Sequence, residues 1–211
     1  MRNLDTLVDE IYESAVNPSV WMDVMERLAQ LADAEGTLLV ATSPNINGMA
    51  PGRTQWIATP KIQEMVNTWL NSERLIKLNI RGERLMKIRE PRWLTDLDGL
   101  TQDEINNHPY YTEFVRPSGL GWVAGTTIRS SCDDLLLFSI ERSYKKGPVE
   151  RERIAQLDLL RPALARAALF SARLGLERAR TSVDTFELVG LPAAAIGSNG
   201  RLISAIHGFE G

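Results

Sequence analysis

The sequence predicts an α+β fold: an antiparallel sheet packed against helices, followed by a long helix and a short β-hairpin. Short apolar runs of strand length occur in pairs among segments of helical periodicity. They are TLLVAT at 37–42, TQWIAT at 54–59, GWVAGTTIR at 121–129 and LLLFSIER at 135–142. One helical pattern then extends from Pro148 to about Phe186, and a strand, a turn and a second strand follow Gly190. Antiparallel strands with helices packed against them define the α+β class.

Apolar residues at helical spacing and recognisable end signals predict the shorter helices. Asn17-Pro18 separates the first two helices, and Pro60 opens the third. Thr101 and Glu104 have the spacing of a capping box at the start of a further helix. The predicted helices cover 3–16, 20–33, 60–73, 101–108 and 109–117.

Three segments are predicted to be connections. Residues 43–53 are polar and rich in Pro and Gly, and SSCDD at 130–134 is a hairpin turn. Residues 76–100 show no sustained period, so we predict a loop with short turns that is placed to cover a pocket.

The helical pattern after Pro148 is too long for one small domain to bury. At about 1.5 Å per residue, it spans more than about 55 Å. Pro162 lies well inside it and predicts a kink or a junction between two helices. The pattern is consistent with packing along the α+β domain or with a dimerising coiled coil. The candidate dimerisation residues are Leu157, Leu160, Leu164, Leu169, Leu176 and Val183.

Composition bounds the class of protein. The 211 residues carry a net charge of −3, so they have no overall basic character for binding nucleic acid. The single cysteine, Cys132, excludes an internal disulfide framework. The N-terminal sequence is not that of a signal peptide, and no apolar run reaches the length of a membrane span. We therefore expect a cytoplasmic protein without membrane contact.

No catalytic constellation is apparent in the sequence. His108 and His207 each stand alone, and Cys132 has no histidine nearby in sequence. Phosphate-binding loops, HExxH and GxSxG are also missing. We expect neither enzymatic activity nor a metal or cofactor.

Aromatic residues are the more informative candidates for a site. Seven of them fall in segments expected to face one sheet and its covering loop: Trp56, Trp69, Trp93, Tyr110, Tyr111, Phe114 and Trp122. Such side chains could line a small-molecule pocket, or they could simply fill the core. The candidate ligand-binding residues are Trp56, Trp69, Tyr111, Phe114 and Trp122.

Several stretches resemble the N-terminal sensory part of LuxR-type helix-turn-helix transcriptional regulators, which is GAF- or PAS-like. HPYYTEFVRPSGLGWVAGTTI at 108–128 is similar to the family's phrase "Y-x-E-F-x-R-P-x-G" before a strand, and RWLTDLDGLTQDEINNHPYY at 92–111 matches the stretch before it. Residues 148–179 are similar to the helical linker, and GLPAAAIGSNGRLISA at 190–205 resembles the first hairpin of a PAS-like segment. The residue spacing that holds an acyl-homoserine lactone is not recognisable, so that ligand is not carried over.

The resemblance implies a sensory and dimerisation module with three parts. Residues 1–146 would form a GAF-like sensory domain, 147–188 a helical dimerisation linker, and 189–211 the truncated start of a PAS-like segment. The module would bind an unknown small molecule as a homodimer, and we expect the DNA-binding domain to lie outside these 211 residues. The alternatives are a standalone binding or oligomeric protein with no DNA role, and a small enzyme that depends on His108.

Overall fold

The computed structural model describes residues 2–42, 54–129, 135–188, 191, 193–196 and 202–205. The predicted loop at 43–53, the turn at 130–134 with Cys132, the turn at 198–200 and His207 lie outside these ranges. The side chain of Leu176 is also outside the described part of the structure.

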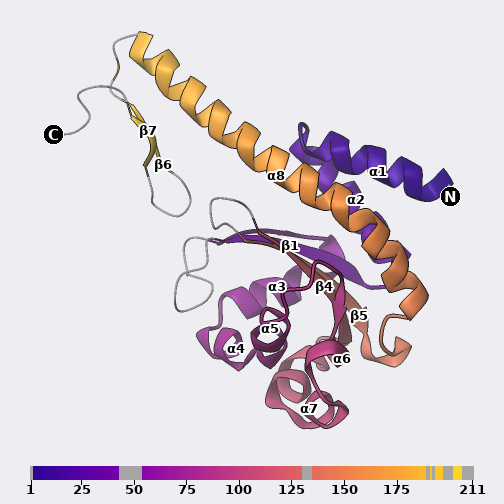
Figure 1. Ribbon diagram of the computed structural model, residues 1–211. Helices are drawn as coiled ribbons and strands as arrows, with labels where there is room; N and C mark the ends of the chain where they lie inside the picture. The colour runs from indigo at the N-terminus through magenta and orange to yellow at the C-terminus, as the bar shows by residue number, and fades with distance from the viewer. Residues whose placement is uncertain are drawn as a thin grey trace.

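A five-stranded antiparallel sheet forms the centre of the fold (Figure 1). Its order is β2-β1-β5-β4-β3, so β5 occupies the middle and pairs with β1 and β4. The strands are β1 (Gly36–Thr42), β2 (Thr54–Ala58), β3 (Leu94–Thr95), β4 (Leu120–Arg129) and β5 (Leu135–Ser143). The predicted α+β class is confirmed, and the four long strands lie within a residue or two of their predicted bounds.

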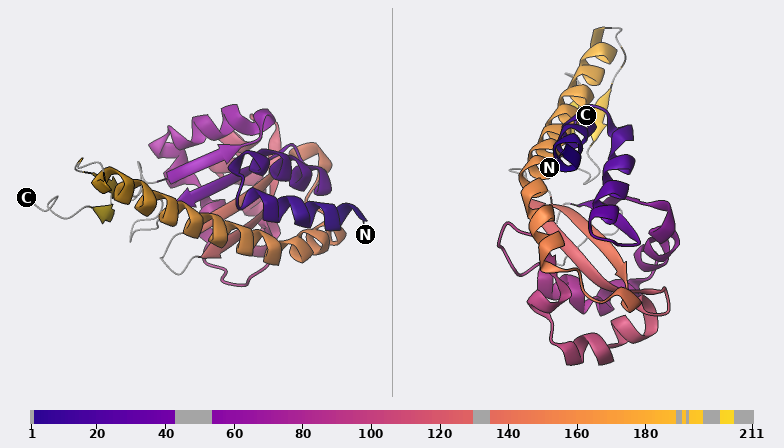
Figure 2. Two further views of the ribbon diagram at one scale, coloured as in Figure 1. Left: turned by 90° about the horizontal axis from the view of Figure 1, so that it is seen from above. Right: turned by 90° about the vertical axis from the view of Figure 1, so that its right-hand side faces the viewer.

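Helices cover both faces of this sheet (Figures 1 and 2). One face carries α1 (Arg2–Ser14), α2 (Trp21–Leu31) and the first half of α8 (Arg151–Leu188). On the opposite face lie α3 (Gln63–Leu70), α4 (Glu73–Leu78), α5 (Ile80–Leu85), α6 (Asp96–Gly99) and α7 (Gln102–Asn107). Single 3₁₀ turns occupy Pro18–Val20, Pro60–Ile62 and Tyr144–Lys146.

The prediction of a loop at 76–100 was wrong, because this segment holds α5, β3, α6 and the end of α4. Each helix has only one or two turns, which is too short to show a helical period. Their end signals are nevertheless present: Ser72 accepts a hydrogen bond from the Leu75 amide, and Asn79 accepts one from the Gly82 amide. Such N-caps satisfy backbone donors that a helix leaves unpaired at its start.

The predicted capping box at Thr101 and Glu104 is confirmed at the start of α7. The short helix predicted at 109–117 is a π-helix, Tyr110–Val115. His108 ends α7, and its Nδ1 accepts a hydrogen bond from the Tyr110 amide at 3.2 Å. This histidine therefore holds the junction between the two helices.

Strand β5 divides the interior into two cores by simple alternation. Successive side chains of a strand point to opposite faces. Leu136, Phe138 and Ile140 pack in the first core, with α1, α2 and α8. Leu137, Ser139 and Glu141 face α3 and α5 on the other side. The second core, on this side, contains six of the seven aromatic residues singled out in the sequence, but Trp93 packs in the first core against Phe138.

Helix α8 is one continuous helix whose two halves have different surroundings (Figure 1). Leu157, Leu160 and Leu164 are buried in the first core, so they hold the helix on its own domain and are not available at the surface. Beyond them Leu169 and Phe170 are exposed, by 39% and 53%, as the helix extends past the sheet.

Three features complete the description of α8. The predicted junction at Pro162 is not observed, because the helix continues through this residue, which is exposed. Solvent can therefore reach the turn where proline removes a hydrogen bond. Val183 is buried, and the hairpin of β6 (Ala194–Ile196) and β7 (Leu202–Ala205) contacts the same helix.

We expect Leu164→Ala to lower the free energy of unfolding by about 2–5 kcal/mol, because it leaves a cavity in the first core. The matched control is Leu159→Ala on the same helix, since Leu159 is 70% exposed and its loss should change stability by less than about 0.5 kcal/mol. Urea unfolding followed by circular dichroism measures both. Equal effects of the two substitutions would show that α8 does not form part of the domain core.

Candidate functional site

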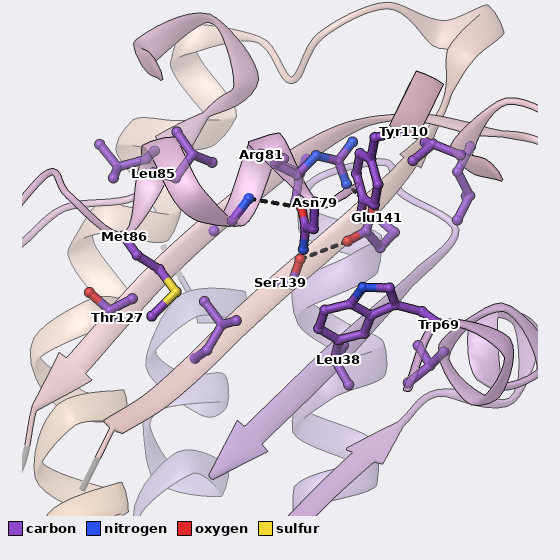
Figure 3. Close-up of a pocket in the computed structure, with 18 of the residues that line it drawn as sticks. Leu38, Trp69, Asn79, Arg81, Leu85, Met86, Tyr110, Thr127, Ser139 and Glu141 are labelled. Carbon is purple, nitrogen blue, oxygen red and sulfur yellow. Dashed lines mark hydrogen bonds and ion pairs between the residues drawn. The ribbon is translucent and has the colours of Figure 1, made fainter. Parts of the chain in front are cut away.

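A cavity of about 70 Å³ lies between the sheet and helices α3 and α5 (Figure 3). Strands β4 and β5 supply one wall, and helices α3 and α5 supply much of the other. Leu85, Met86 and Thr127 lie toward one end of the close-up, and Trp69, Tyr110 and Glu141 toward the other. The cavity thus has a largely apolar end and an end that carries hydrogen-bonding groups.

A buried ionic network borders the polar end. The Arg81 guanidinium donates to Asp96 Oδ1 at 2.8 Å and to Glu141 Oε2 at 2.9 Å. All three side chains are buried. The Ser139 hydroxyl donates to Glu141 Oε1 at 2.7 Å and fixes that carboxylate from the cavity side. A buried arginine is tolerated where carboxylates pair with it and hydrogen bonds satisfy the remaining polar atoms.

Short local structures position the members of this network. Arg81 projects from α5, whose first turn is capped by Asn79. Asp96 starts α6, where it accepts hydrogen bonds from the Tyr111 hydroxyl and the Val123 amide, each at 2.6 Å. The network therefore joins α5, α6, the π-helix and strands β4 and β5.

The charges of the network are set by its surroundings. Burial by itself would lower the pKa of Arg81, but Asp96 and Glu141 raise it well above its ordinary value. Arg81 therefore remains a cation. Burial raises the pKa of Tyr110 and of Tyr111, so both hydroxyls stay protonated at neutral pH. The Arg81 guanidinium also lies over both rings, 5.8 Å from the Tyr110 centroid and 5.2 Å from that of Tyr111.

The indole N–H of Trp69 has no hydrogen-bond partner among the described residues. Trp69 lines the cavity and is only 6% exposed. In Figure 3 the nitrogen edge of its ring is turned toward the end of the cavity where Glu141 lies. A buried donor without a partner is costly, and each such group calls for an explanation. An acceptor on a molecule inside the cavity would provide one.

The structure brings only part of the predicted site to the cavity. Of the five candidates, Trp69 lines it, and Tyr111 is bonded to Asp96 behind Arg81. Phe114 and Trp122 pack in the second core, with Trp122 stacked on Tyr144, and Trp56 packs at the margin of that core.

Sequence reasoning missed Arg81, Asp96 and Glu141. Arg81 and Asp96 fall in the segment that was predicted to be a loop, so nothing indicated that they were buried. For Glu141 a signal was present in the sequence: Ser139 and Glu141 alternate with the apolar Phe138 and Ile140 in the strand predicted at 135–142. Period-two alternation places two polar side chains on one buried face, which is typical of a site.

A larger hollow opens at the surface beside the cavity. Its volume is about 360 Å³, and its walls include Lys61, Ile62 and Gly119. Met65 and Leu120 line both this hollow and the inner cavity. These two side chains therefore lie at the border between the cavity and the hollow.

No family model and no curated protein matches the sequence. Solved structures do share the fold. CepR2 of Burkholderia cenocepacia, an N-acylhomoserine-lactone-dependent LuxR-family transcription factor, aligns with a TM-score of 0.55 at 10% identity, over 81% of this chain and 98% of its own. The ligand-binding domain of VqsR from Pseudomonas aeruginosa gives 0.55 at 14% identity, over 80% and 96%. SdiA in complex with octanoyl-rac-glycerol gives 0.51 at 16% identity, over 80% and 60%.

These likenesses establish a fold that is shared with LuxR-family regulators and a ligand-binding domain. In the described part of the chain, no helix has the length and apolar character needed to span a bilayer. The same residues contain no cluster of three or more metal-ligating side chains.

We expect Asp96→Ala to lower the free energy of unfolding by about 3–5 kcal/mol, because it breaks a buried ion pair. It also removes the acceptor of the Tyr111 hydroxyl and of the Val123 amide. The control is Glu83→Ala, which breaks the exposed pair with Lys87 and should cost less than about 1 kcal/mol. Urea unfolding compares the two; a loss below about 1 kcal/mol for Asp96→Ala would contradict a structural role for the network.

Proposed function

We propose that this chain is the sensory module of a transcription regulator and that it binds a small molecule in the cavity between the sheet and helices α3 and α5. The observation that carries the proposal is the Trp69 N–H, which borders a largely apolar cavity and has no hydrogen-bond partner among the residues that the structure describes. Apolar walls with a few converging polar groups are typical of small-molecule sites. The shared fold and the LuxR-like phrases at 92–128 support the same assignment.

The small volume of the cavity implies that its walls move when a ligand binds. About 70 Å³ holds only a few water molecules. Met65 and Leu120 stand between it and the surface hollow, and methionine is an adaptable side chain. We propose that a ligand enters by displacing Met65, so that cavity and hollow become continuous.

We further propose that the chain acts as a homodimer through the outer half of α8 and relays ligand binding to a DNA-binding domain. In this organisation the domain at residues 1–146 senses the ligand, the helix at 147–188 links two protomers, and residues 189–211 begin a further segment. This half of the helix exposes three apolar side chains, which supports placing the dimer contact there: Leu169, Phe170 and Leu188.

We expect 1-octanoyl-rac-glycerol or N-octanoyl-homoserine lactone to raise the melting temperature of the purified chain, since a ligand that binds only the folded state stabilises it. Leu85→Trp should abolish the shift, because Leu85 lines the cavity and a larger ring fills it. Differential scanning fluorimetry measures the effect.

Leu97→Trp is the control, because Leu97 is 49% exposed and outside the cavity wall. It should retain the full shift. A shift that persists in Leu85→Trp would place binding elsewhere, and no shift with either probe would count against ligands of this kind.

Sedimentation velocity at micromolar concentration tests the dimer. We expect the chain to sediment as a dimer and the double substitution Leu169→Glu, Phe170→Glu to yield monomers, because charge at an apolar helix contact is strongly unfavourable. Leu97→Glu, on α6 at the opposite side of the molecule, should leave the dimer intact. A monomeric parent chain would contradict the proposal.

A further inference from the structure

The buried ionic network that borders the polar end of the cavity carries an uncompensated negative charge. Two of the described residues that line the cavity are charged, Arg81 and Glu141, and Arg81 is bonded from behind by Asp96. One guanidinium therefore faces two carboxylates, so the network has one formal negative charge in excess. In a buried site this excess acts on any bound molecule with little screening by water.

Glu141 is the member of the network that carries this charge to the cavity. Asp96 does not line it and is fully engaged by Arg81, the Tyr111 hydroxyl and the Val123 amide. Glu141 lines the cavity, and each of its two oxygens has one donor, Arg81 or Ser139. A carboxylate offers about four acceptor positions, so Glu141 retains capacity for a donor on a ligand.

Trp69 is the second polar group at this end of the cavity, and it needs an acceptor from the ligand, whereas Glu141 needs a donor. Trp69 can only donate, and its N–H is unpartnered within the described structure. A molecule that forms hydrogen bonds with both side chains therefore presents an acceptor to Trp69 and an O–H or N–H donor to Glu141.

Resting on the ligand-binding function proposed above, we infer that Glu141 is a specificity-determining residue that selects ligands by charge. The cavity takes a neutral molecule whose polar end contains both an acceptor and a donor, and it excludes carboxylates and other anions. An anion would be desolvated beside an existing excess of negative charge, for which the cavity offers no free cation among the described residues.

Three probes with the same acyl chain separate these requirements. 1-Octanoylglycerol is neutral with an acceptor and donors, methyl octanoate is neutral with an acceptor only, and octanoate is an anion. Isothermal titration calorimetry of the chain at pH 7.5, with each probe below its micelle concentration, should give affinities in that order. We expect octanoate to bind at least about tenfold more weakly than 1-octanoylglycerol, the factor that one unfavourable polar contact produces.

Glu141→Gln removes the charge and keeps the shape of the side chain. In this variant the affinity for octanoate should rise at least about tenfold, because the negative charge is gone. The preference for 1-octanoylglycerol over methyl octanoate should fall, because the glutamine amide offers a donor of its own. Glu73→Gln on α4, an exposed residue outside the cavity wall, should leave all three affinities unchanged.

Glu141 is itself buried, so a second variant covers the case in which Glu141→Gln does not fold. Ser139→Ala removes the hydrogen bond that orients the carboxylate but leaves the charge. It should reduce the donor preference while octanoate remains excluded.

Two results would overturn the inference alone: octanoate that binds the parent chain as tightly as 1-octanoylglycerol, or a folded Glu141→Gln variant with an unchanged order of affinities. If none of the three probes binds the parent chain, the proposed function of the cavity fails, and the inference fails with it.

Discussion

The position of Arg81 is the constraint on which the arrangement of the site depends. A buried guanidinium is stable only with its carboxylates in place, and Asp96 and Glu141 come from segments 15 and 60 residues away in sequence. The pairing thereby ties α5 to α6 and to the central strand β5. Hydrophobic contacts alone would leave such short helices free to shift, because they are non-directional. Ionic hydrogen bonds give these elements a defined position over the sheet.

The same network accounts for a cavity at this place in the structure. Polar groups on the inner face of β5 cannot pack tightly against the apolar residues of α3, and they need partners at fixed distances. Arg81 satisfies Glu141 from one side, which holds α5 away from the strand, while Trp69 approaches from α3. The space between them remains open, and the Trp69 N–H has no hydrogen-bond partner in the described part of the chain. If leucines occupied all of these positions, the helices could pack directly on the sheet and leave no cavity.

The sequence predicted what depends on local pattern, and it missed what depends on long-range pairing. The four long strands, the first helices, the capping box at Thr101 and the long helix all have a period or an end signal of their own. The segment 76–100 has no period, because its helices are only one or two turns long. Its buried residues include the charged Arg81 and Asp96, whose burial depends on their pairing with each other and with Glu141. Aromatic content indicated a core or a pocket, but composition does not distinguish the residues that fill space from those that border it.

Strand β5 provides one physical connection between the cavity and helix α8. Glu141 faces the cavity, and its neighbour Arg142 faces the other way, where it donates to both carboxylate oxygens of Glu150 at 2.6 and 2.7 Å, directly before α8. That bidentate pair lowers the pKa of Glu150 to about 2, so it persists across the neutral range. A ligand can bias α8 only if its contacts differ between two positions of this junction. Because the first half of the helix packs in the first core, such a difference would displace the outer half of α8 as a tilt of the whole helix, and local unwinding is the less favourable route.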